Sequence, residues 1–182
     1  MKNILKSLLT ISALSSLVIA PVILNAGQAA AQPRQVTRGT DASYVGIGAG
    51  IRITDSDKED DGNVGGNVAA RLKLLNMGDL QLSARGNVLW NNETSAIIPE
   101  VSVDVPIARN TNAFVTGGYS FVQEQGVSTP IGDRNAVVVG AGLESAVGRN
   151  VLIYTNAKLG IRSFETTERS AVTLNGGVGF SF

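Results

Sequence analysis

The sequence contains no cysteine and no histidine, and its charges cancel. Without cysteine, the chain can form no disulfide framework and use no thiolate chemistry. The 15 lysines and arginines equal the 15 aspartates and glutamates, so there is no cationic excess for phosphate contacts. A nucleic-acid partner is therefore not expected. Apolar runs of spanning length are also missing after residue 31, so no further transmembrane helix is predicted.

The amino-terminal segment differs from the rest of the chain. Lys2 and Lys6 precede an apolar stretch that ends in the small residues Ala29–Ala31. A positive start, an apolar middle and a small-residue end are typical of a secretory signal peptide. We expect residues 1–31 to be a cleaved signal peptide. An uncleaved membrane anchor is the alternative, which Pro21 disfavours.

In the remainder of the chain, apolar residues alternate with period two rather than at helical spacing, which predicts β-strands. Eight such segments lie between turn-rich breaks, at residues 42–54, 63–75, 79–90, 95–107, 112–123, 135–147, 150–162 and 170–182. Regularly spaced strands joined by turns predict either a β-sandwich or a β-barrel. They are longer than soluble strands, which have about 5–6 residues. The eight segments are also long enough to cross a bilayer as tilted strands, which takes about 9–11 residues.

Each segment has one apolar face and one face of polar residues and glycine. In the segment at 150–162, Ile153 and Leu159 share one face, and Tyr154 and Lys158 share the other. The polar faces carry Gly46, Gly48, Gly50, Gly65, Gly118, Gly140, Gly142, Gly160, Gly177 and Gly179. Glycine weakens an exposed strand, but it leaves room inside a narrow barrel. We therefore predict an all-β fold, an eight-stranded antiparallel up-and-down transmembrane β-barrel with its apolar face towards lipid.

The connections between the segments alternate in length. The longer ones are residues 55–62, 91–94, 124–134 and 163–169, and the short ones are residues 76–78, 108–111 and 148–149. Transmembrane barrels have short periplasmic turns and longer external loops. The short turns share the end of the barrel that holds both termini, which places both termini in the periplasm. Residues 32–41 are then a periplasmic leader, and residues 42–182 form the barrel.

Aromatic residues are expected near both ends of the barrel. Trp90, Tyr119 and Phe121 fall near the loop end, and Phe180 and Phe182 fall near the turn end. Two thin aromatic girdles at the membrane interfaces would follow.

The last segment carries the most specific signal. Leu174, Val178, Phe180 and Phe182 share the lipid-facing parity, and the sequence ends in phenylalanine. This pattern resembles the carboxy-terminal signature recognised by the outer-membrane barrel assembly machinery. The chain is similar in architecture, over residues 42–182, to the small barrels that include the OmpA transmembrane domain, OmpX and the opacity-type surface antigens. The resemblance implies a location in the cell outer membrane, with outer-membrane lipid and the assembly machinery as partners, and we expect a monomer.

By strand parity, nine charged residues face the interior of the barrel. They are the cations Arg52, Arg71, Lys73, Arg85, Lys158 and Arg162 and the anions Glu100, Asp104 and Glu144. Charges in a low-dielectric interior must be paired or hydrated, so we expect a paired network with some positive charge to spare. Side chains can fill an eight-stranded barrel. The network is then interpreted as a polar plug that closes and stiffens the barrel, as the resemblance to OmpA implies. A selectivity filter is the alternative.

No catalytic, cofactor or metal site is predicted. Outer-membrane barrels that are enzymes rely on histidine as acid or base, and this chain has none. Gly46–Gly50 resembles a phosphate loop, but no helix follows it. Asp55–Gly62 resembles a calcium loop, but neither possible register completes the pattern. A solvated acidic external loop is expected there, with divalent-cation binding as the alternative.

Pro99 fits poorly inside the fourth segment, because proline cannot donate to a ladder of hydrogen bonds. We expect it near the external rim or at a bulge, with residues 100–107 crossing the bilayer.

The predicted role is structural or surface-exposed, in the integrity of the envelope or in contacts made by the external loops. A narrow channel for ions or very small solutes is the second hypothesis. A third is a secreted soluble barrel that carries a small apolar ligand, which would require the apolar faces to point inward.

Overall fold

The computed structural model describes residues 39–54, 63–166 and 169–182. The predicted signal peptide, residues 32–38 of the leader and the acidic loop at 55–62 lie outside the described residues. In the described part of the chain, no helix has the length and apolar character needed to cross a membrane.

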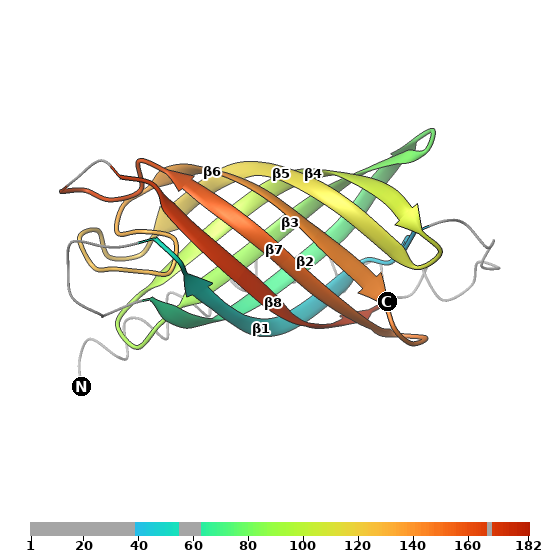
Figure 1. The fold of residues 1–182 in the computed structure, drawn as a ribbon, viewed down its shortest axis with the longest axis horizontal. Coiled ribbons are helices and arrows are strands. Elements are labelled where there is room, and N and C mark those ends of the chain that lie inside the picture. The colour runs from blue at the N-terminus through green and yellow to red at the C-terminus, as the bar shows by residue number, and fades with distance from the viewer. Residues whose placement is uncertain (1–38, 55–62, 167–168) are drawn as a thin grey trace. The chain divides into compact units, whose positions relative to one another are not determined.

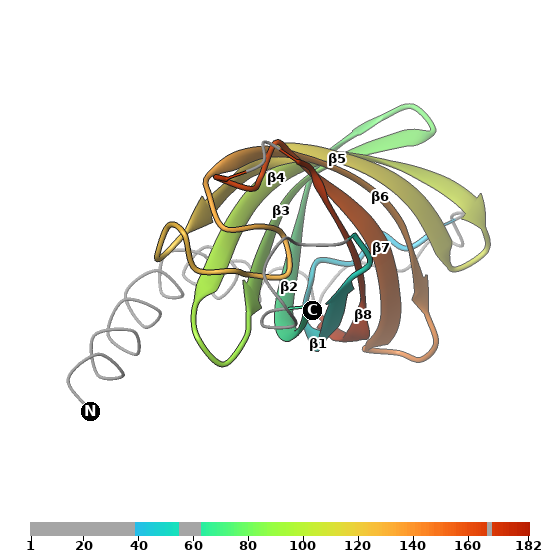
Figure 2. The same cartoon turned by 60° about the vertical axis from the view of Figure 1, so that its left-hand side comes forward.

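Eight antiparallel strands form a closed barrel, within one compact unit that spans Val36–Ser181 (Figures 1 and 2). The strands are β1 (Tyr44–Arg52), β2 (Val64–Met77), β3 (Leu80–Trp90), β4 (Ser95–Ala108), β5 (Thr111–Val122), β6 (Ala136–Ala146), β7 (Val151–Ile161) and β8 (Ala171–Ser181). Each strand pairs with its sequence neighbours, and β1 pairs with β8 to close the barrel. The predicted fold is confirmed, and the predicted strand ends lie within two residues of the observed ones.

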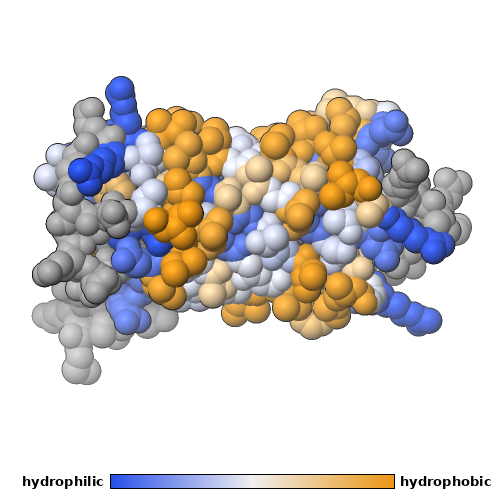
Figure 3. Space-filling model, viewed as in Figure 1, coloured by the Kyte–Doolittle hydropathy of each residue, from blue (hydrophilic) through white to orange (hydrophobic). Residues whose placement is uncertain are grey.

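The apolar faces of the strands point outward. Ile47 on β1 is 65% exposed, and Phe180 on β8 is 67% exposed. On the face that Figure 3 shows, hydrophobic side chains gather in bands across the barrel, with hydrophilic side chains beyond them at both ends. In water, this exterior would be a very large exposed apolar patch. In a bilayer it faces lipid, and the paired backbone of a closed barrel is what a transmembrane β-structure requires. The hypothesis of a soluble carrier with inward apolar faces is therefore wrong.

Two bulges interrupt the regular alternation that the sequence predicted. In β2 the register shifts between Lys73 and Leu75, so Leu74 and Leu75 are both exposed. In β4 the register shifts between Pro106 and Ala108. Bulges insert one unpaired residue and are common at the rims of barrels.

Of the two positions expected for Pro99, the external rim and a bulge, the bulge is wrong. Pro99 pairs with Gly86 of β3 in continuous register. On its other side, the register with β5 passes from Ile97↔Phe121 to Glu100↔Gly118 without a shift. Proline has no N–H to donate, and β4 accommodates Pro99 by leaving a gap in its ladder with β5. No extra residue is inserted.

The inward glycines allow β1 and β8 to approach each other closely. A Cβ atom at Gly48 would meet the backbone oxygen of Gly176 and would lie 2.7 Å from the Cα atom of Gly177. A Cβ atom at the outward Gly117 would meet nothing within 4 Å.

Gly48→Ala is therefore expected to destabilise the barrel by about 1–3 kcal/mol, because the backbone of β8 must shift to admit the methyl group. Gly117→Ala is the matched control, and we expect it to leave the stability unchanged or to raise it by up to about 1 kcal/mol. Urea unfolding of the barrel in lipid vesicles measures both. Equal effects of the two substitutions would contradict the packing described here.

Candidate functional site

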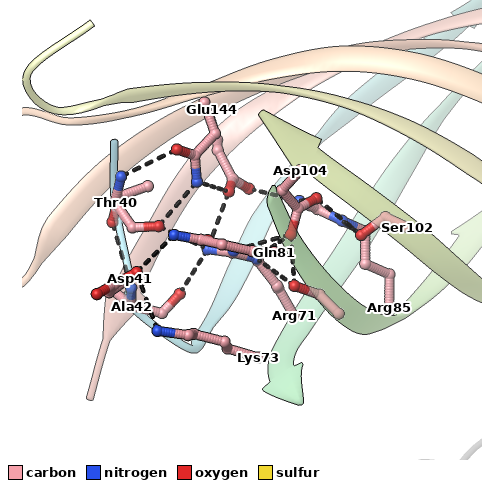
Figure 4. A network of polar contacts seen from close by, with 12 residues as sticks. Thr40, Asp41, Ala42, Arg71, Lys73, Gln81, Arg85, Ser102, Asp104 and Glu144 are labelled. Atoms are coloured by element: carbon pink, nitrogen blue, oxygen red, sulfur yellow. Dashed lines mark hydrogen bonds and ion pairs between the residues drawn. The ribbon is translucent and has the colours of Figure 1, made fainter. Parts of the chain in front are cut away.

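Four charged side chains meet inside the barrel, near the end that holds the short turns (Figure 4). Arg71 of β2 and Arg85 of β3 alternate with Asp104 of β4 and Glu144 of β6. Asp104 accepts from Arg71 Nη2 and Arg85 Nη2, at 2.8 Å each, through its two oxygens. Glu144 lies 3.0 Å from Arg71 Nη1 and 2.9 Å from Arg85 Nη2. All four side chains are buried.

The strand register explains why these residues meet. Arg71 lies directly opposite Arg85 in the β2–β3 ladder. Two like charges opposite each other repel, so the pair needs carboxylates between its members. Asp104 pairs with Gln81 on the β3–β4 ladder, which puts it within reach of both guanidinium groups. We call these four residues the charge square.

Neutral groups complete the hydrogen bonding of the charge square. Ser83 Oγ and Ser102 Oγ both donate to Asp104, the second at 2.8 Å. Arg85 donates to Tyr44 OH at 3.1 Å, and its guanidinium carbon lies 3.7 Å from the centroid of the Phe114 ring. Buried ion pairs stabilise only when such additional bonds satisfy the remaining donors and acceptors.

Residues 39–43, which we call the strap, are fastened to the charge square at its turn end. Arg71 Nη1 donates to the backbone oxygens of Thr40 and Ala42, at 3.1 and 3.0 Å. The backbone N–H of Thr40 donates to Asn112 Oδ1 at 3.1 Å, and Asn112 Nδ2 donates to Thr40 O at 2.8 Å. Asp41 accepts from Gln81 Nε2 at 2.5 Å and pairs with Lys73 Nζ at 3.0 Å. Of the predicted leader, Thr40 is thus buried inside the barrel, and Asp41 lies at its rim.

A second buried ion pair joins Glu100 of β4 to Lys158 of β7, across the barrel from each other. Lys158 Nζ lies 2.5 Å from one carboxylate oxygen of Glu100 and 2.6 Å from the other. Glu100 also accepts from Asn87 Nδ2 at 2.7 Å and from Thr116 Oγ1 at 3.0 Å. Both charged side chains are almost fully buried.

Two tyrosines also fill the interior, Tyr44 opposite Arg71 on the β1–β2 ladder and Tyr154 opposite Glu144 on the β6–β7 ladder. The Tyr44 and Tyr154 rings stack with centroids 5.9 Å apart. Tyr154 OH donates to Asn67 Oδ1 at 2.8 Å.

Arg52, at the loop end, has neutral partners. It donates to Ser128 Oγ and to the backbone oxygen of Thr129 at 2.8 Å each, and to Asn63 Oδ1 at 2.6 Å. It forms no ion pair with a carboxylate among the described residues. These contacts bind the β5–β6 loop, residues 123–135, to the inner face of β1.

The β5–β6 loop also contributes to an apolar layer inside the loop end. Its Ile131 is fully buried in a cluster. The other members of the cluster are Leu89, Ala96, Ile98, Val122 and Val138. The backbone oxygen of Pro130 accepts from Thr173 Oγ1 at 2.5 Å. This loop is predicted from the sequence to be external, and its inward side chains are not foreseen, although an isoleucine in a loop is a signal for burial.

Two of the nine predicted interior charges lie elsewhere. Arg162 is exposed, because the chain leaves β7 through a left-handed residue at this position (φ 49°), which breaks the strand parity. Lys73 lies at the rim and is partly exposed where it pairs with Asp41. The structure places the other seven inside the barrel, with Arg71, Arg85 and Lys158 paired to Asp104, Glu144 and Glu100.

Three of the four residues of the predicted assembly signal lie on the outer face of β8, and the fourth follows the strand. Leu174, Val178 and Phe180 are exposed large hydrophobic residues, and Phe182 is half-buried. No cluster of three or more acidic side chains that could hold a metal ion occurs in the ranges that the structure describes.

Comparisons with known proteins agree on the fold. No family model and no curated protein sequence matches the chain. The crystal structure of Ail, the attachment invasion locus protein of Yersinia pestis, matches with a TM-score of 0.53 and 14% identity, over 79% of this chain and 100% of that one. Ail in a phospholipid bilayer nanodisc matches with a TM-score of 0.51 and 16% identity, over 78% and 99%. A designed transmembrane β-barrel matches with a TM-score of 0.50 and 11% identity, over 80% and 100%.

These likenesses show a shared fold. Together with the apolar exterior, they define the chain as a small eight-stranded transmembrane β-barrel.

Proposed function

We propose that this protein is a closed barrel with a structural or surface-exposed role in the cell envelope, and that its interior network is a polar plug. The observation that carries the proposal is the succession of contacts along the barrel interior. The strap and the charge square lie at the turn end, the Glu100–Lys158 pair follows, and the apolar layer around Ile131 lies at the loop end. A continuous water path for ions would have to pass all of these layers.

A rigid interior suits a scaffold that presents loops. Arg71 and Arg85 each contact two carboxylates and also have neutral hydrogen-bond partners, and Lys158 donates to both oxygens of Glu100. Such satisfied networks hold side chains in one arrangement. The proposed role is not catalytic, since histidine is absent from the sequence. We further propose that the barrel assembly machinery recognises the outer face of β8, including Phe180, together with the terminal Phe182 during biogenesis.

Single-channel recording in planar lipid bilayers tests the closed state. We expect the folded protein to give no steady unit conductance, and Glu100→Gln to leave this unchanged as long as the barrel stays folded. A steady conductance in the wild-type protein, altered in size or ion selectivity by Glu100→Gln, would contradict the plug and support a narrow channel.

A further inference from the structure

Two of the three short turns carry the same pair of residues at equivalent positions. Arg109–Asn110 connects β4 to β5, and Arg149–Asn150 is the second half of the turn, residues 147–150, that connects β6 to β7. The third short turn, between β2 and β3, has Gly78 and Asp79 and no arginine. Lys73 of β2, at the same rim, is paired with Asp41. Positive charge without a carboxylate partner among the described residues is therefore concentrated on the sector of this rim formed by β4 to β7.

The asparagine of each pair anchors its turn to the end of a further strand. The backbone oxygen of Asn110 accepts from the N–H of Ala146 at 2.9 Å. The backbone oxygen of Asn150 accepts from the N–H of Ser181 at 2.9 Å, and Asn150 Nδ2 donates to Ser181 O at 3.0 Å. The first of these bonds also sets the turn of Arg109 beside the end of β6, directly before the turn of Arg149. Both arginines thus extend from fixed backbone on neighbouring turns, which reduces the entropy lost when they bind a ligand.

Both guanidinium groups are available to a ligand. Arg109 and Arg149 are exposed, and neither forms an ion pair with any residue that the structure describes. The lipid face next to them is apolar. Its exposed members on β4, β6 and β7, and at the start of the β6–β7 turn, are Val105, Ile107, Leu143, Val147 and Ile153. Cationic side chains at the edge of such a belt lie at the depth of lipid headgroups (Figure 3).

We propose that Arg109 and Arg149 form a binding site for the headgroup phosphate of an anionic phospholipid in the inner leaflet of the outer membrane. Arginine binds phosphate through two parallel N–H donors, which gives geometric specificity beyond charge. The acyl chains of the same lipid lie against the apolar members of β4, β6 and β7. A soluble phosphate ion would leave this second surface unused, so the site is assigned to a lipid. The inference depends on the membrane placement of the turns and not on whether the interior conducts.

Lipid selectivity measured by electron spin resonance tests the site. The full-length folded protein is placed in phosphatidylcholine vesicles that contain spin-labelled phosphatidylglycerol or spin-labelled phosphatidylcholine. We expect the wild-type protein to prefer phosphatidylglycerol, and Arg109→Gln with Arg149→Gln to lower this preference by about fivefold for each arginine. The heat-dependent gel mobility of each variant shows whether it is folded.

The matched control removes the same charge at the opposite rim. Arg134 Nε donates to the backbone oxygen of Arg162, so these two arginines are also neighbours. Arg134→Gln with Arg162→Gln should leave the preference unchanged. Equal losses in the two double variants, or no preference in the wild-type protein, would overturn the site. Displacement of the labelled lipid by an excess of soluble glycerol phosphate would overturn its assignment to a lipid.

Discussion

Asp104→Asn is expected to destabilise the barrel by about 3–5 kcal/mol, the usual cost of breaking a buried ion pair from one side. The carboxylate of Asp104 lies 2.8 Å from both Arg71 and Arg85, which face each other across two strands. Without it, two buried guanidinium groups share the single carboxylate of Glu144. Removal of one partner leaves an uncompensated buried charge, and this penalty is larger than the net value of the pair itself.

The measurement is urea unfolding in lipid vesicles, followed by the fluorescence of Trp90, which is the only tryptophan of the chain. The control is Asp41→Asn. Asp41 also pairs with a cation, Lys73, but both side chains are partly exposed at the rim. We expect a loss of no more than about 1 kcal/mol from the control. A small loss from both substitutions would show that the charge square is hydrated or mobile.

Substitutions in the Glu100–Lys158 pair are expected to have the second large effect on stability. The losses of the two single variants should not add in the double variant. Glu100→Gln leaves a buried ammonium group without its partner, and Lys158→Met leaves a buried carboxylate. Each single substitution is expected to cost about 3–5 kcal/mol. The double variant removes both charges and keeps an amide that can bond Asn87 and Thr116. It should therefore lie close to the wild-type protein in stability.

A double-mutant cycle on the same unfolding assay measures this coupling. For a buried pair, the sum of the two single losses should exceed the loss in the double variant by several kcal/mol. If the two losses simply add, the coupling energy is zero. The contact at 2.5 Å would then contribute nothing to stability.

Strand parity accounts for most of what the sequence could predict. Ile47, Val178 and Phe180 point outward, and Arg71, Asp104 and Lys158 point inward, because a strand alternates its side chains with period two. Parity says which side chains share the interior, and the register then decides which of them meet. The register of the strand pairs could not be predicted from parity, because two bulges shift it. They lie at Lys73/Leu75 and at Pro106/Ala108.

The errors fall where the chain leaves regular strand geometry. Arg162 has the right parity for the interior, but one left-handed residue turns its side chain outward. Thr40 and Asp41 lie before the first strand, and Ile131 lies in a loop, so no period-two pattern applied to them. Their positions depend on side chains from distant strands, such as Asn112 and Gln81. These contacts join segments that are far apart in the sequence, so they can be identified only from the three-dimensional structure.

The most direct test of the whole account is the electrophoretic mobility of the native protein, extracted from outer membranes and run in SDS with and without boiling. Folded small barrels resist SDS, because their backbone hydrogen bonds are all internal. We predict two distinct mobilities, with the unboiled form shifted relative to the boiled one, and recovery of the protein in the outer-membrane fraction. A single mobility under both conditions, with the protein in the soluble periplasmic fraction, would contradict the transmembrane barrel.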